Sequence, residues 1–185
     1  IVIAGSEAAR GDVPMFKPSD LHQLAADHYD ADLADAAEAL MRYDAPIKYS
    51  SGTAYANAKL FVAYWSAGLA RKLPAGMTVN AVSPGSAPDT NAGRNAPFLM
   101  KKVLVPFFKL MPGKSAPISV AASRFVEASE YPEQVSGEFF ASAPKKMIGE
   151  LHKVDLAHIN DRDSQDAAWE ALVRVSGGID YPVAV

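Results

Sequence analysis

The chain alternates short apolar segments with long helical segments, and this order limits the folds that it can adopt. The apolar segments predict strands, which lie at residues 1–5, 77–82 and 137–141. The segments with helical spacing of apolar residues lie at 19–43 (with Ser19 as the expected N-cap and a break near residue 29), 53–72, 118–129 and 163–175, and a short helix is expected around residues 98–110. Residues 7–18 are expected to be a loop. Strands separated by helices are typical of a parallel sheet. We therefore expect an α/β fold with a doubly wound parallel sheet of about three visible strands.

The first strand starts at the first residue, with the apolar run Ile1-Val2-Ile3-Ala4. A parallel sheet of only three strands has two edges and little area to cover, so it is a weak independent domain. We therefore expect the 185 residues to be part of a longer protein, with a polar C-terminal tail at residues 146–185 that contains one helix.

The composition excludes several classes of function. The 185 residues are 49% hydrophobic and 21% charged, which is typical of a folded globular protein. The formal net charge of −3 does not favour a polyanion, so we expect no nucleic-acid partner. The absence of cysteine excludes disulfides, zinc–thiolate sites, iron–sulfur clusters and cysteine nucleophiles.

No apolar run approaches the roughly 18 residues that a helix needs to cross a bilayer. We therefore expect no transmembrane segment and a cytoplasmic location. His152, Asp155, His158 and Asp161 are close in the sequence, but their spacing fits no known set of metal ligands. We therefore expect no metal site.

The helix expected at 53–72 carries a tyrosine and a lysine four residues apart, Tyr55 and Lys59. This spacing places both side chains on one face of a helix. An ammonium group near a phenol favours the phenolate and lowers the pKa of the tyrosine, which makes it a usable general acid or base. The spacing alone fits a surface pair without a role equally well.

Other polar features lie at the carboxyl ends of the expected strands. Ser6 follows the first strand, the segment 80–85 (Asn-Ala-Val-Ser-Pro-Gly) ends the second, and Thr90 comes shortly after. In an open parallel sheet these ends meet at one edge, where ligands bind. A serine hydroxyl there can donate a hydrogen bond to a substrate oxygen.

Together these residues resemble the classical short-chain dehydrogenase/reductase family. That family has a strand that ends in a catalytic serine, then Tyr-x-x-x-Lys on a helix, then a strand close to Val-Asn-x-Val-x-Pro-Gly, and then a threonine. The resemblance covers residues 1–140, and it is nearest to the retinol-dehydrogenase-like branch. It implies a Rossmann-type sheet, in which the three expected strands are the fifth, sixth and seventh. Residues 1–145 would then be the C-terminal part of this domain, with residues 19–45 as a helical insertion.

The resemblance also implies a reaction and a cofactor. The protein would be an NAD(P)-dependent oxidoreductase that interconverts a carbonyl and an alcohol, with NADP favoured over NAD. Tyr55 would transfer the proton, Lys59 would lower the pKa of Tyr55 and bind the nicotinamide ribose, and Ser6 would orient the carbonyl. The residues that would contact the cofactor are Tyr55, Lys59, Pro84, Gly85, Ser86 and Thr90.

The chain departs from the family pattern in two ways. The glycine-rich phosphate loop is absent, because no two glycines are two residues apart. Ser6 and Tyr55 are 49 residues apart, far more than is usual in the family, because residues 19–45 are inserted between them. We interpret the insertion as a cap over the substrate side of the site. A surface elaboration or an oligomer contact is the alternative.

The substrate and the partners are less constrained. Residues 96–112 are rich in apolar side chains and lie where the family has its substrate loop, which suits an apolar small-molecule substrate, although they fit packing against the core equally well. A homo-oligomer is expected through Phe61, Val62 and Trp65, which also suit the chain's own core. Two other functions stay open: a non-catalytic remnant or binding module, and a sugar-nucleotide-modifying relative.

Overall fold

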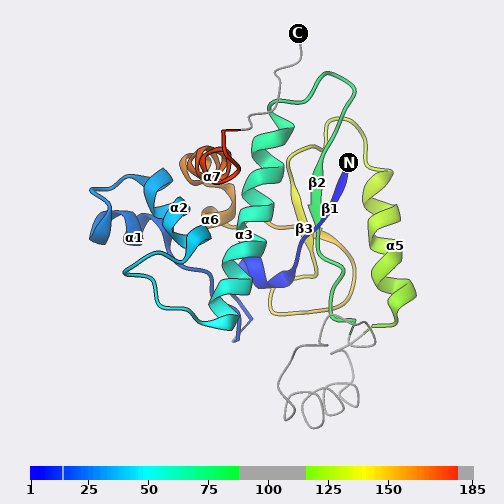
Figure 1. Cartoon of the computed structure of the whole chain (residues 1–185). Helices are drawn as coiled ribbons and strands as arrows, with labels where there is room; N and C mark the ends of the chain where they lie inside the picture. The colour runs from blue at the N-terminus through cyan, green and yellow to red at the C-terminus, as the bar shows by residue number, and fades with distance from the viewer. Residues whose placement is uncertain (14, 88–115, 179–185) are drawn as a thin grey trace.

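The computed structural model describes residues 1–13, 15–87 and 116–178, which form a mixed α/β structure around one open sheet (Figure 1). Strands β1 (Val2–Ala4), β2 (Asn80–Val82) and β3 (Phe139–Ala141) are parallel neighbours in that order. A fourth strand, β4 (His152–Lys153), pairs antiparallel with β3. The α/β class and the three parallel strands are confirmed. Strand β4 was not predicted, because its two residues are exposed and show no apolar pattern.

The helices agree broadly with the sequence pattern. The described helices are η1 (Glu7–Arg10, a 3₁₀ turn), α1 (Leu21–His28), α2 (Leu33–Arg42), α3 (Ser51–Ala70), α5 (Ile118–Ser129), α6 (Ala157–Asn160) and α7 (Arg162–Val175). The break expected near residue 29 separates α1 from α2. A short helix expected around residues 98–110 lies outside the described residues.

Two local expectations were wrong. The segment 7–18, expected as a loop, begins with η1, in which the Ala8 N–H donates to the Ser6 side chain. Ser19 was expected to cap the next helix, but Asp20 does so by accepting from the Gln23 N–H at 3.0 Å. Ser19 instead exchanges two hydrogen bonds with the Asn57 side chain on α3, at 2.7 and 3.0 Å.

Helices α3 and α5 cover opposite faces of the sheet. Side chains alternate along a strand, so neighbouring residues face opposite sides. Ala81 and Phe139 pack in a cluster with α3, whereas Val82 and Phe140 pack in a cluster with α5. Figure 1 shows the sheet between the two helices.

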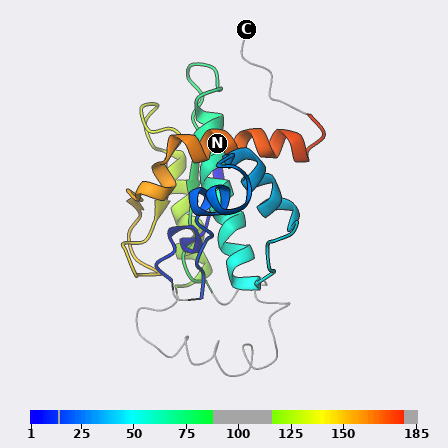
Figure 2. The same ribbon diagram turned by 90° about the vertical axis from the view of Figure 1, so that its left-hand side faces the viewer.

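A further layer of helices covers the outer side of α3. Helix α7 packs against α2 and α3, and Figure 2 shows α7 and the first two helices in front of α3. Trp65 of α3 stacks on Trp169 of α7, with ring centroids 6.3 Å apart and planes at 6°. Phe61 and Val62, with Trp65, therefore pack partly within the chain's own core. The homo-oligomer stays a prediction.

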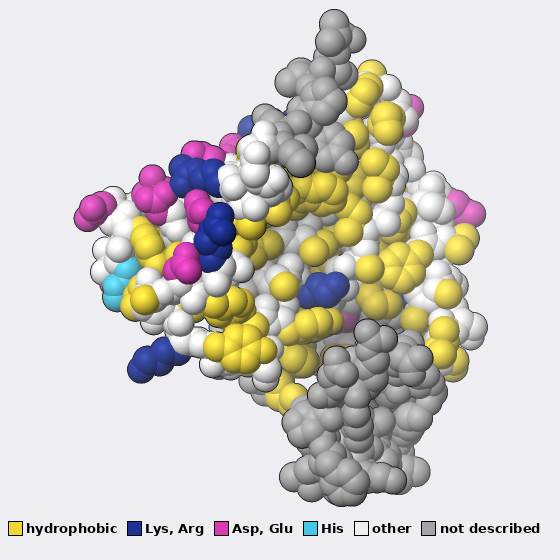
Figure 3. All heavy atoms as spheres, viewed as in Figure 1, with side chains coloured by type: hydrophobic (Ala, Val, Ile, Leu, Met, Phe, Trp, Pro, Cys, Tyr) yellow, Lys and Arg dark blue, Asp and Glu magenta, His cyan; other side chains and the backbone are white. Residues whose placement is uncertain are grey.

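The edge of the sheet at β1 is open in the described part of the chain, where β1 pairs only with β2. Apolar side chains gather on the face of the molecule over β1, α3 and α5 (Figure 3). Ile1 is 55% exposed, and Val120 and Val126 of α5 are also exposed. It stays a prediction that residues 1–145 belong to a larger sheet domain.

No helix among the described residues has the length and apolar character to cross a membrane.

The stacking of Trp169 predicts that the C-terminal segment stabilises the whole fold. Trp169 is 8% exposed and packs against Leu69 and Val79. Trp169→Ala should lower the free energy of unfolding by about 3–5 kcal/mol, because a large buried side chain is replaced by a cavity. Chemical denaturation followed by circular dichroism measures this loss. Arg162→Gln on the exposed side of α7 is the control and should change stability by about 0.5 kcal/mol or less. A similar small change for Trp169→Ala would contradict the packing role.

Candidate active site

Tyr55 and Lys59 lie on the first turns of α3, and Lys59 contacts the end of strand β1. The Lys59 Nζ donates a hydrogen bond to the Ala4 carbonyl at 3.0 Å and lies 5.9 Å from the centre of the Tyr55 ring. Lys59 is half-buried, and this burial lowers the pKa of its ammonium group. The predicted pair is therefore held together on one helix face and is positioned against β1.

The Tyr55 ring is accessible from solvent. The side chain is 44% exposed, and its ring packs against Phe16 at a centroid distance of 5.4 Å. Phe16 belongs to the segment between η1 and α1, which approaches the first turn of α3 at Gly52. A Cβ at Gly52 would collide with the Met15 carbonyl, so the glycine permits this approach. The phenol is thus supported on one side and open on another.

Ser6 lies directly after β1, two residues beyond the carbonyl that Lys59 contacts. Its backbone is extended, and its Oγ accepts a hydrogen bond from the Ala8 N–H at 3.2 Å. A hydroxyl has one proton to donate as well as two lone pairs, so this contact leaves the Ser6 proton available for a substrate oxygen. The structure therefore brings Ser6, Tyr55 and Lys59 to the same end of the sheet.

Pro84, Gly85 and Ser86 follow β2, the neighbour of β1, as expected. Gly85 has a φ of 79°, and a Cβ there would lie 2.9 Å from the Met147 carbonyl oxygen. The Ser86 N–H donates to the same carbonyl at 2.8 Å. The chain's own packing therefore accounts for the glycine, and the contact of this segment with a nicotinamide stays a prediction. Thr90 lies outside the described residues.

A buried charge network lies at the same end of the sheet and was missed by the sequence reasoning. Glu7 is 2% exposed and Arg124 is 4% exposed, and their nearest side-chain atoms are 3.4 Å apart. Ser83 and Ser142, at the ends of β2 and β3, are bonded to both. The available signal was the position of Arg124, because it shares the inward face of α5 with Ala121 and Ala128.

Arg10 forms a second buried cluster beside this network. Its guanidinium donates to the carbonyls of Ser142, Ala143 (3.1 Å) and Lys146 (2.7 Å), and it pairs with Asp12 at 3.1 Å. The three carbonyl contacts tie the end of η1 to the chain that follows β3. Arg10 therefore has a structural role and its charge is not available to a ligand.

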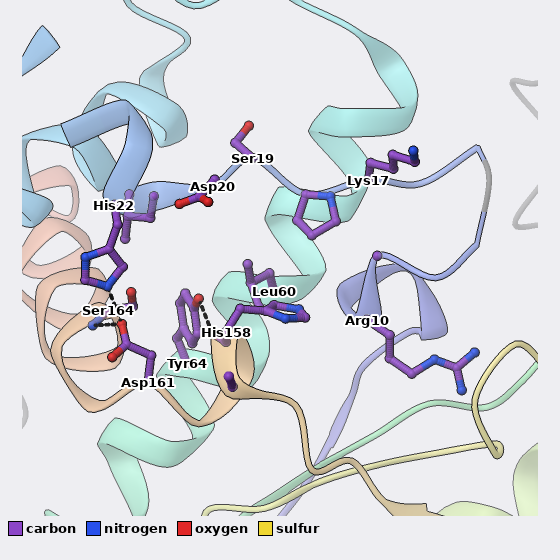
Figure 4. Close-up of a pocket in the computed structure, with 14 residues that line it drawn as sticks. Arg10, Lys17, Ser19, Asp20, His22, Leu60, Tyr64, His158, Asp161 and Ser164 are labelled. Atoms are coloured by element: carbon purple, nitrogen blue, oxygen red, sulfur yellow. Dashed lines mark hydrogen bonds and ion pairs between the residues drawn. The ribbon is translucent and has the colours of Figure 1, made fainter. Parts of the chain in front are cut away.

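A cavity among the described residues lies elsewhere on α3. It has a volume of about 650 Å³ and is lined by Leu60 and Tyr64 of α3 together with residues from α1, α6 and α7 (Figure 4). Leu60 and Tyr64 are on the opposite side of the helix from Tyr55 and Lys59. The cavity lining does not include Tyr55, Lys59 or Ser6. We therefore place the candidate site at Ser6, Tyr55 and Lys59 and not at this cavity.

Contacts across that cavity attach the insertion to the C-terminal helices. The His22 ring contacts Asp161 at 2.8 Å, and Asp161 also accepts from the Ser164 N–H at 3.1 Å. Burial alone would raise the pKa of Asp161, but the hydrogen bonds from Ser164 and His22 outweigh it and lower the pKa. Burial raises the pKa of Tyr64 to about 12.

The contacts of the insertion join it to the outer helical layer. Helices α1 and α2 pack against each other, and α2 packs against α7. The interpretation of the insertion as a cap over the substrate stays a prediction. The side chain that contacts Tyr55 is Phe16, which precedes the insertion. A surface elaboration that extends the outer helical layer agrees better with these contacts.

Comparison with known proteins identifies no family for this chain. No protein-family model matches the chain, and a search of curated proteins finds no match. Within the described ranges, no group of three or more histidine, aspartate or glutamate residues is placed to hold a metal ion. The functional inference therefore depends on the motifs and on where the structure places them.

The burial of Lys59 predicts a measurable dependence of stability on pH. The lowered pKa means that the folded state loses this proton at a lower pH than the unfolded chain, whose lysines have a pKa of about 10.4. Between these two values the unfolded state binds more protons, so stability rises with pH in that window. Lys59→Met should reduce this rise when unfolding is measured from neutral to alkaline pH. Lys153→Met, at a residue exposed at the sheet edge, is the control; identical slopes in both variants would contradict the prediction.

Proposed function

We propose that this chain carries the catalytic residues of an NAD(P)-dependent oxidoreductase that interconverts a carbonyl and an alcohol. The observation that supports it most is the hydrogen bond from Lys59 Nζ to the Ala4 carbonyl. This bond places the Tyr-x-x-x-Lys helix against the strand that ends in Ser6, which is the arrangement that the family resemblance implies. A Rossmann-type sheet is part of the proposal.

Each of the three residues has a distinct part in the proposed reaction. In reduction, the Tyr55 hydroxyl donates a proton to the carbonyl oxygen, and in oxidation the phenolate accepts it back. The Lys59 ammonium lies 5.9 Å from the centre of the Tyr55 ring, where its positive charge favours the phenolate. The Ser6 hydroxyl donates a hydrogen bond to the same substrate oxygen and orients it.

The cofactor, when bound, supplies or accepts the hydride, and the residues present fit only one end of it. Tyr55 is exposed and Lys59 is half-buried beside it, so both can reach a ribose hydroxyl at the nicotinamide end. The chain contains no glycine-rich loop for the phosphates. We therefore assign to residues 1–185 the nicotinamide end alone. NADP as the preferred form, an apolar substrate and a contact through Thr90 are parts of the proposal that rest on the resemblance.

One observation favours a second candidate, a non-catalytic binding module. The chain has no glycine-rich loop to bind the phosphates of a dinucleotide, and the 650 Å³ cavity among the described residues includes none of Ser6, Tyr55 and Lys59. A sugar-nucleotide-modifying relative is less well supported, because the segment 80–85 resembles the classical branch. Turnover separates the first candidate from the second.

Tyr55→Phe tests the proposal directly. The change removes one exposed hydroxyl and should lower kcat by about 10²-fold or more, because the proton donor is lost. Oxidation of NADPH or NADH with a series of apolar aldehydes and ketones, in the protein that carries this chain, measures the rate. Cofactor affinity and the unfolding midpoint should stay nearly unchanged.

The matched control is Tyr49→Phe, because Tyr49 is 72% exposed and lies outside α3. It should leave kcat unchanged. Equal turnover by Tyr55→Phe and by the unchanged chain would remove Tyr55 from the mechanism. If the unchanged chain shows no turnover with either cofactor, the non-catalytic candidate replaces the enzyme.

A further inference from the structure

One buried hydroxyl connects the two segments that the proposed reaction would bring together. Ser83 is fully buried, and its Oγ accepts from the Glu7 N–H at 3.1 Å and from the Gly85 N–H at 3.2 Å. The same hydroxyl donates to the Glu7 carboxylate. A hydroxyl has one proton and two lone pairs, so Ser83 is fully used by these three bonds. Glu7 directly follows Ser6, and Gly85 belongs to the segment expected at the nicotinamide.

The Glu7 carboxylate is itself held from the other side. Its Oε1 accepts from the Ser142 Oγ at 3.0 Å and faces Arg124 Nη1 at 3.4 Å. Arg124 also donates to the Ser83 carbonyl at 3.0 Å, to Ser142 Oγ at 2.8 Å and to the Gly149 carbonyl at 2.5 Å. Within the described residues, no buried side-chain nitrogen or oxygen lacks a partner. The orientation of Ser83 is therefore fixed by a charged pair.

Joining two loops through a buried charged pair has a large desolvation cost. The attraction and hydrogen bonds of the two charges must offset this penalty, and apolar residues often stabilise a fold as well. What distinguishes Glu7 and Arg124 is their position between Ser6 and Gly85. Two backbone N–H groups, one from each candidate segment, point to a single oxygen atom.

We propose that Glu7, Ser83 and Arg124 are positioning residues that hold Ser6 and Gly85 in a fixed relative position. This inference rests on the proposed function, in which Ser6 binds the substrate oxygen and Gly85 lies at the nicotinamide. A displacement of about 1 Å between reacting groups can cost about 10²-fold in rate, so a rigid link between the two segments has a direct effect on turnover. Glu7 and Arg124 act through Ser83 and do not themselves touch the substrate.

Hydrogen exchange tests the link without any assay of activity. Glu7→Gln keeps the size of the side chain but removes its charge, which weakens the bond to Ser83. The Gly85 amide does not contact the Glu7 side chain, yet its hydrogen should exchange roughly tenfold faster in this variant. The Gly85 amide should also exchange roughly tenfold faster in Ser83→Ala. Ser66→Ala is the matched control, because Ser66 is also fully buried but bonds only to the Val62 carbonyl on α3. Unchanged exchange at Gly85 in both test variants would overturn the link.

A kinetic cycle tests the positioning role. Ser83→Ala should lower kcat by roughly ten- to a hundredfold. Since the loss acts through Ser6, the double variant Ser6→Ala/Ser83→Ala should be little slower than Ser6→Ala alone. Additive losses would show a general structural effect and overturn the positioning role. If the unchanged chain has no turnover, the proposed function and the role that depends on it both fail, while exchange at Gly85 still decides whether Ser83 links the two segments.

Discussion

A buried carboxylate at the end of the sheet determines how the surrounding segments fit together. Glu7 makes contact with the ends of β2 and β3 through Ser83 and Ser142, and with α5 through Arg124. An unpaired charge in this place would cost several kcal/mol, so the four segments are stable only in the arrangement that satisfies the carboxylate. The ends of three short strands, which share few ladder hydrogen bonds, are thereby held in one geometry.

Helix α3 depends on burial on almost every side. Its residues are apolar around most of its circumference, which is typical of a helix enclosed within a protein. The sheet covers one side through Ala63 and Leu60, and α7 covers another through Trp65. The first turns extend past these layers, and there Tyr55 is exposed. The exposed residues of this helix therefore lie in its N-terminal turns.

Local sequence patterns predicted the elements that are long or strongly apolar. The three parallel strands, the break between α1 and α2, and the shared face of Tyr55 and Lys59 all follow from spacing along a few turns or a few residues. The placement of Ser6 at a strand end follows from the same reasoning. These features need only neighbouring residues to specify them.

The features that were missed depend on residues far apart in the chain. Strand β4 exists because His152 and Lys153 meet the edge of β3, and its own two residues carry no signal. Asp20 rather than Ser19 caps α1 because Ser19 is taken by Asn57 across the fold. The bond between Glu7 and Arg124 joins residues separated by 117 positions, and no local pattern specifies such a pair.

The placement of α3 and α5 on opposite faces has a topological consequence. The strands β1, β2 and β3 are parallel and follow one another in one direction, so two crossover helices on opposite faces have crossovers of opposite hand. Left-handed crossovers are rare among parallel strands, at about 2%. The two strand–helix–strand units of this sheet are therefore mirror-related in their winding. Each unit therefore packs its helix on the sheet with its own set of side chains.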